Sequence, residues 1–156
     1  MIFEEKEITA RKLTASSVIP IDIDTAWEKV KTSSLLVFIA KGKIKFKPAD
    51  GRFPECWKEN ETIATKMFLY GLIPFGGLHT IRFEKIDNEN RCMRTSEQNG
   101  VTKVWRHAIS MKKISDHSIF YTDEIIIYGG ILTGIITWWA KHFFKHRQQK
   151  WKLLKK

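Results

Sequence analysis

Apolar and polar residues alternate along much of the first 128 residues, and this pattern predicts an antiparallel sheet. Short turn signals separate the alternating stretches; the strongest are Asn99-Gly100 and the polar run at residues 87–90. Lysines at every second position of residues 43–47 are typical of a strand at the edge of a sheet. We expect seven strands, over residues 8–20, 43–47, 61–70, 79–86, 91–98, 103–113 and 118–128.

Two short helices are predicted between the first and second strands. Asp22 is a suitable N-cap for a helix that carries Trp27 on its apolar side. At a helix start, Asp22 and Asp24 are interpreted as a cap and a dipole partner rather than as a catalytic carboxylate pair. Ser33-Ser34 opens the second helix, which should run over residues 35–40.

The last 27 residues, 130–156, are predicted to form one long helix without an internal proline. Such a helix needs a large apolar partner surface, and a curved sheet supplies one. We therefore predict a single α+β domain over residues 1–156, in which a curved antiparallel sheet of about seven strands grips the C-terminal helix and leaves a pocket beneath it. The spacing assigns to the buried helix face Ile131, Leu132, Ile135, Ile136, Trp139 and Phe143.

The segment GLIPFGG, residues 71–77, has the glycines and proline of a turn but apolar residues between them. Such residues are costly to expose in a turn. They are interpreted as a lid over the mouth of the pocket, as a packing contact with a neighbouring element, or as a membrane contact.

Composition excludes several classes of protein. A hydrophobic content of 43% and six tryptophans exclude a disordered chain. The longest uncharged run, residues 125–140, is shorter than the ~20 residues that cross a bilayer. The acidic N-terminus does not resemble a signal peptide, and Cys56 and Cys92 match no disulfide framework or metal spacing. A reduced, cytoplasmic setting is therefore expected.

The net charge of +10 is concentrated at the C-terminal end, because seven of the basic residues follow Glu124 without any acid among them. One interpretation is a solvated helix end whose cations complement the helix dipole. The other is contact with an anionic partner, a phospholipid surface or RNA, but not DNA. Membrane contact would use Lys141, Lys145, Arg147 and Lys150.

Several stretches resemble the START-like, or SRPBCC, superfamily, whose fold is called helix-grip. SSVIPIDIDTAWEKV at residues 16–30 is similar to the opening of that family. KVWRHAISM at 103–111, IFYTDEIIIYGGIL at 119–132 and WWAKHFFKHRQQKWKLL at 138–154 resemble its polyketide cyclase-like branch. The resemblance implies a cavity under the helix that binds a hydrophobic small molecule or lipid, although some members are cyclases or hydrolases.

His107 is the candidate with the most chemical interest. A two-residue turn at Ser115-Asp116 would place His107 opposite Glu124, whereas a slip of one residue would bring Asp123 to that face. A histidine–carboxylate pair beside aromatic residues can act as a general base or orient a ligand carbonyl. It can equally be a structural cross-strand pair.

The favoured function is binding of a hydrophobic small molecule or lipid. The alternatives are a cyclase/dehydrase-like enzyme that uses His107 with Asp123 or Glu124, and surface binding by the basic helix. No cofactor motif is present, and His142 and His146 lack a third metal ligand, so neither a cofactor nor a metal is expected. Alternation assigns to the ligand-binding wall Met67, Leu69, Ile81, Phe83, Trp105, His107, Ile109 and Trp138, and Phe75 joins them from the segment 71–77.

Overall fold

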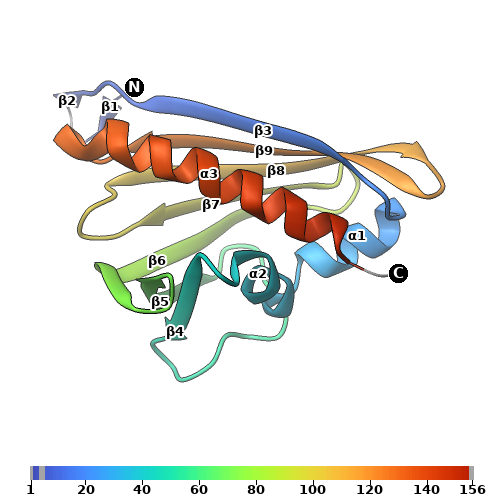
Figure 1. The fold of residues 1–156 in the computed structure, drawn as a ribbon, viewed down its shortest axis with the longest axis horizontal. Helices are drawn as coiled ribbons and strands as arrows, with labels where there is room; N and C mark the ends of the chain where they lie inside the picture. Colours follow the sequence, from blue (N-terminus) through green and yellow to red (C-terminus); the bar gives the residue numbers. More distant parts are fainter. Residues whose placement is uncertain (1, 4–5, 155–156) are drawn as a thin grey trace.

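A seven-stranded antiparallel sheet forms the body of the protein (Figure 1). The computed structural model describes residues 2–3 and 6–154, with side chains from Ile8 onward. The strand order is β3-β9-β8-β7-β6-β5-β4, so the first and the second of these strands in sequence are the two edges. The strands are β3 (Arg11–Ile19), β4 (Ile44–Pro48), β5 (Thr62–Leu69), β6 (Ile73–Asp87), β7 (Cys92–Gln98), β8 (Val104–Ser115) and β9 (Ser118–Tyr128), and β1 (Ile2–Phe3) pairs separately with β2 (Lys6–Glu7).

Helices cover one face of this sheet. The short helices α1 (Ile23–Val30) and α2 (Ser33–Ala40) follow β3, and the single turn η1 (Gly130–Leu132) leads into α3 (Thr133–Lys152). Helix α3 runs across the sheet along nearly its whole length (Figure 1). The predicted α+β helix-grip architecture is therefore confirmed, including β4 as an edge strand.

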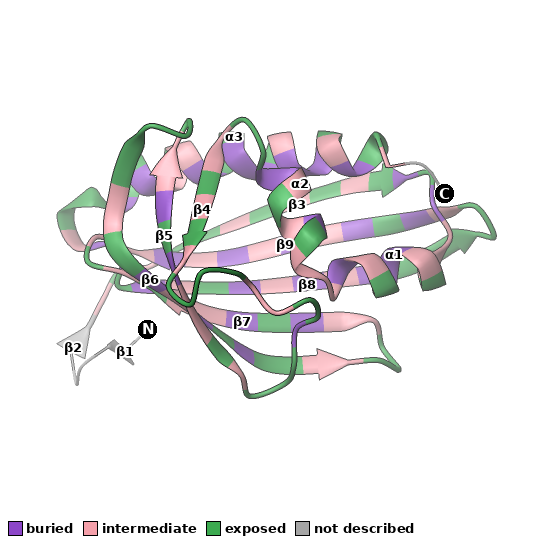
Figure 2. Ribbon diagram, turned by 90° about the horizontal axis from the view of Figure 1, so that it is seen from below, coloured by how far each residue is buried: buried purple, intermediate pink, exposed green. Residues whose placement is uncertain are grey.

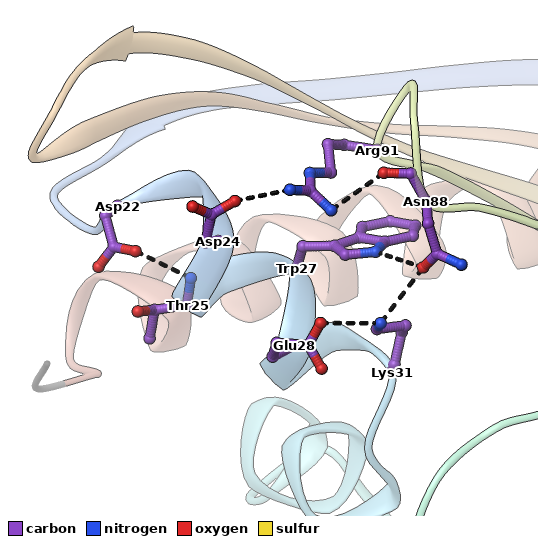
Figure 3. A network of polar contacts seen from close by, with 8 residues as sticks. All are labelled: Asp22, Asp24, Thr25, Trp27, Glu28, Lys31, Asn88 and Arg91. Atoms are coloured by element: carbon purple, nitrogen blue, oxygen red, sulfur yellow. Dashed lines mark hydrogen bonds and ion pairs between the residues drawn. The ribbon is translucent and has the colours of Figure 1, made fainter.

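Polar contacts fasten α1 to the turn between β6 and β7 (Figure 3). Asp22 caps the helix, since its side chain accepts a hydrogen bond from the backbone N–H of Thr25 at 2.9 Å. The fully buried Trp27 donates from Nε1 to Asn88 Oδ1 at 2.8 Å. Arg91 Nη2 donates to Asp24 at 2.6 Å, so both aspartates have structural roles, as predicted.

The segment 71–77 is mostly strand, not turn. Strand β6 already begins at Ile73, and only Tyr70, Gly71 and Leu72 form the connection to β5. Gly76 and Gly77 have φ angles of +71° and +66° and form a bulge opposite the Lys66–Met67 step of β5. The prediction of a turn over 71–77 mistook these bulge glycines for turn glycines.

The buried face of α3 differs from the predicted one. Ile131 and Ile135 are fully and 64% exposed, respectively, although the sequence pattern assigned both to the core. The reason is that two polar residues, Arg147 and Gln148, belong to the buried face, and counting apolar positions alone misplaces the stripe. The buried helix residues are Thr133, Ile136, Ala140, Phe143, Phe144, Arg147, Gln148 and Trp151.

The core lies between this helix face and the central strands. Buried residues recur at every second position of β9 and over much of β8 (Figure 2). Trp27, Tyr121 and Trp151 are fully buried near one end of α3, where α1 also packs. Near the start of α3, by contrast, Trp138 is 63% exposed.

Candidate ligand-binding cavity

A cavity of about 380 Å³ lies between the sheet and α3. Its wall comes from α2, α3 and strands β4 to β8, and most of its lining side chains are apolar. A volume of this size falls in the ~300–1,000 Å³ range of small-molecule sites. The structure brings together in this wall all nine residues assigned from the sequence, namely Met67, Leu69, Phe75, Ile81, Phe83, Trp105, His107, Ile109 and Trp138. Their contact with a ligand stays a prediction.

The cavity meets solvent beside the start of α3. Ile135 and Trp138 line the cavity and are 64% and 63% exposed, so they lie where it opens. Trp139 Nε1 donates to the hydroxyl of Tyr70 at 3.4 Å, which places the β5–β6 turn next to this helix. Together these elements form the mouth of the cavity.

His107 pairs with Asp123, not with Glu124. Its Nε2 lies 2.7 Å from Asp123 Oδ1, and the two side chains are 6% and 0% exposed. The tight turn is Asp116-His117, one residue later than predicted, and a bulge at Ile114 then leaves His107 opposite Ile125. Glu124 therefore projects from the other face of β9, where it forms an ion pair with Lys12 at 3.4 Å.

Asp123 is the centre of a buried polar network. Besides His107, the Tyr121 hydroxyl donates to its Oδ1 at 3.0 Å and Gln148 Nε2 donates to its Oδ2 at 3.2 Å. Burial alone would raise the pKa of Asp123, but the charge of Arg147 and the hydrogen bonds outweigh it and lower the pKa. Burial and the Asp123 charge raise the pKa of Tyr121, so its phenol stays protonated and donates.

A second polar cluster lies on β6 and β7. His79 Nε2 lies 2.9 Å from Glu97 Oε1, and the Thr95 hydroxyl donates to Glu97 Oε2 at 2.9 Å. Asn99 Oδ1 accepts from the backbone N–H groups of Val101 and Thr102, so its Nδ2 must be the atom that faces His79 Nδ1 at 2.9 Å. Nδ1 therefore accepts, and His79 is the neutral tautomer that donates from Nε2 to Glu97.

Glu97 keeps its charge in this position. Burial by itself would raise the pKa of Glu97, but the hydrogen bonds from His79 and Thr95 help to outweigh it, and the pKa is lowered. Thr95 stands directly opposite His107 in the β7–β8 pairing. The two clusters thus form one polar belt that crosses an otherwise apolar cavity wall from β6 to α3.

Sequence reasoning missed His79, Glu97 and Arg147 as cavity residues. The signal for the first two was present, because His79 precedes Ile81 and Glu97 follows Met93 at even spacing on their strands. Arg147 was assigned to a membrane-contacting surface, and this is wrong: it is 6% exposed and lines the cavity. Only its position one turn after Phe143, on the buried helix face, could have indicated this.

Of the other predicted membrane-contacting cations, Lys141 and Lys145 are exposed, whereas Lys150 is half-buried with Nζ 5.4 Å from the centre of the Phe38 ring. No helix in the described part of the chain is long and apolar enough to span a membrane.

Comparison with solved structures places this geometry in a known fold. A START superfamily protein from Mycobacterium smegmatis matches with a TM-score of 0.64 at 10% identity, over 90% of this chain and 94% of that chain. Norcoclaurine synthase from Thalictrum flavum matches at 0.63 and 12% identity, over 94% and 95%. The Zhui aromatase/cyclase from Streptomyces sp. R1128 matches at 0.58 and 10% identity, over 78% and 70%. No family model matches the sequence, and neither does any curated protein.

The chain therefore has the START-like helix-grip fold, as its sequence predicted. An aromatase/cyclase is among the structures that share this fold, in agreement with the resemblance to the polyketide cyclase-like branch. Identities of 10–12% establish the fold alone, so the function has to be argued from the cavity.

Proposed function

We propose that the protein binds a hydrophobic small molecule or lipid in the cavity between the sheet and α3. The observation that carries this proposal is the cavity itself, which stays open although the chain has six tryptophans and ten phenylalanines available to fill it. Well-packed interiors leave few voids larger than a water molecule. A hollow of about 380 Å³ with a mostly apolar wall is thus a feature that binding explains and packing does not.

Native mass spectrometry of the purified protein, repeated after organic extraction, tests the proposal. A bound mass that extraction removes is the expected result, or else a mass shift with added fatty acids, sterols or flavonoid-like rings. The variant I109W should abolish these shifts, because Ile109 lines the cavity and is 4% exposed. R106W, an exposed position on the opposite face of β8, is the matched control. Binding that I109W leaves intact would refute the cavity site.

A second candidate function is docking of the cavity mouth on an anionic membrane. Exposed apolar side chains occur on both elements of the mouth: Leu72 is 83% exposed and Ile73 56% at the β5–β6 turn, and Ile135 and Trp138 are exposed near the start of α3. Isolated exposed apolar residues are ordinary, but a cluster around an opening indicates an interaction surface. Its members are Tyr70, Leu72, Ile73, Ile131, Leu132, Ile135 and Trp138.

The charge beside this cluster favours a bilayer as the partner. Lys141 and Lys145 follow Trp138 at helical spacing, so one exposed stripe of α3 is apolar at its start and basic further along. An interfacial helix combines apolar insertion with attraction to anionic lipid in this way. RNA would match the lysines but leave the apolar cluster without a partner.

Vesicle co-sedimentation tests the docking. The protein should bind phosphatidylcholine vesicles that contain phosphatidylglycerol, bind pure phosphatidylcholine much less, and lose affinity as salt rises. I135D should reduce binding strongly. I114D is the matched control, because Ile114 is 54% exposed at the β8–β9 hairpin, at the opposite end of the sheet from the start of α3 (Figure 1). Equal binding by both variants, or binding to RNA in place of vesicles, would refute the docking proposal.

A further inference from the structure

The side chain of Arg147 is buried without a full set of partners. It is 6% exposed, and its Nε has no hydrogen-bond partner among the residues that the structure describes. The nearest carboxylate oxygen, Asp123 Oδ1, is 4.0 Å from Nη2, which is beyond hydrogen-bonding distance. A buried cation with unmade hydrogen bonds is costly, so its persistence in a core requires a reason.

Asp123 cannot supply the missing bonds. Its Oδ1 already accepts from His107 and Tyr121, and its Oδ2 accepts from Gln148. The carboxylate is therefore held by three donors and acts on Arg147 mainly through its charge. It balances the guanidinium electrostatically but leaves Nε without an acceptor.

The surroundings of Arg147 leave the cavity as the place for an acceptor. Its Cζ lies 4.9 Å from the centre of the Phe144 ring and 5.8 Å from that of Phe143. Aromatic rings contact a guanidinium favourably but accept none of its in-plane hydrogen bonds. Arg147 also lines the cavity, so a molecule inside can reach its donors.

His107 offers a second group at the same point of the wall. Because ionised Asp123 accepts from Nε2, this nitrogen is the donor, and Nδ1 is the ring nitrogen that Asp123 does not engage. His107 lines the cavity too and packs edge-on against the same Phe144 ring, with centroids 5.0 Å apart. A donor fork and an imidazole nitrogen thus flank one ring at the inner surface of the cavity.

We propose that the cavity ligand carries one carboxylate on an apolar chain or ring system, and that this carboxylate is bound by Arg147, at the point of the wall that His107 also lines. The proposal deepens the function proposed above and rests on it. A guanidinium presents parallel N–H donors that match the two oxygens of a carboxylate, whereas an alcohol offers only one oxygen. Glu97, the other buried carboxylate of the cavity wall, already accepts hydrogen bonds from His79 and Thr95, so it has its own partners and is not the counterion of Arg147.

Isothermal titration calorimetry with two matched pairs of probes tests this preference. The pairs are decanoic acid with 1-decanol, and 2-naphthoic acid with 2-naphthylmethanol, so that the acid group is varied on two different apolar bodies. In at least one pair the acid should bind about tenfold or more tightly than the alcohol, as charge-assisted hydrogen bonds are roughly twice as strong as neutral ones. Alcohols that bind as tightly as their acids would refute the preference while leaving the cavity function standing.

Variants assign the preference to Arg147. R147M keeps most of the side-chain length but no donors, and it should bring the ratio of acid to alcohol affinity close to one. K145M, which removes an exposed cation two residues earlier, should leave the ratio unchanged. A ratio that survives R147M would overturn the assignment. If R147M does not fold, the comparison of probes on the unaltered protein still decides the preference. If none of the four probes binds, the acid preference is refuted, whereas the cavity function is decided separately by the mass spectrometry described above.

Discussion

Replacing Asp123 by alanine should be among the most destabilising single changes in this protein. The side chain is fully buried and accepts hydrogen bonds from His107, Tyr121 and Gln148, in addition to facing Arg147. In D123A all three donors lose their acceptor, and the buried guanidinium loses its nearest counter-charge.

The magnitude follows from these contacts. A buried hydrogen-bonding group left unpaired costs about 1–3 kcal/mol, and removal of one partner from a buried ion pair costs about 3–5 kcal/mol. These costs overlap, because water that enters the space left by the carboxylate can serve several donors at once. We expect D123A to lower the free energy of unfolding by about 3–5 kcal/mol, a large part of the ~5–15 kcal/mol typical of a domain.

Urea denaturation followed by tryptophan fluorescence measures this loss, with the m-value as a check that the same surface unfolds. E124A is the matched control, since Glu124 is the next residue, is 42% exposed on its side chain and makes a surface ion pair with Lys12. It should cost about 0.5 kcal/mol or less. Equal losses in the two variants would refute the view that Asp123 organises the core.

Two further outcomes follow from the same contacts. The pKa values of Asp123 and Glu97 are lowered, so the stability that these carboxylates contribute is present above the unfolded carboxyl pKa near ~4 and is lost as the pH falls through the lowered values. The urea midpoint of the protein should therefore decrease when the pH is taken below about 4, and it should decrease less steeply in E97Q. A urea midpoint that rises on acidification would contradict this. G77A should lower the free energy of unfolding by about 1 kcal/mol, because alanine is strained at the positive φ of this position. G76A should lower it by at least about 1 kcal/mol more, since the new Cβ would also displace the Asn99 side chain from the N–H groups of Val101 and Thr102. Equal urea midpoints for the two variants would contradict this.

The sequence predicted the sheet well because each strand alternates and most turns have clear polar signals. It did not predict the register of β8 and β9, since the bulge at Ile114 adds one residue without any mark in the sequence. That single residue decided which acid meets His107. The choice between the two possible partners, Asp123 and Glu124, could be settled only by the backbone register.

Alternation located the apolar wall, because the period of two fixes the face of a strand without reference to its neighbours. Arg147 could not be found in this way. A cation near the end of a basic helix is predicted to be a surface residue. The countercharge that accompanies its burial, Asp123, lies on strand β9, far away in the sequence. A buried pair of polar residues can be recognised only in the folded structure, where the helix and the strand that carry them lie side by side.

The strand order also governs how the chain is assembled. Strands β4 to β9 follow one another as antiparallel neighbours, so this meander can form from contacts between adjacent segments. Strand β3 bonds within the sheet only to β9, with Arg11 opposite Ile127, and it must wait for that strand although it is made much earlier. Helix α3 is synthesised later still and closes the cavity. A ligand present while the protein is made can therefore be enclosed as folding finishes, without having to enter through the mouth.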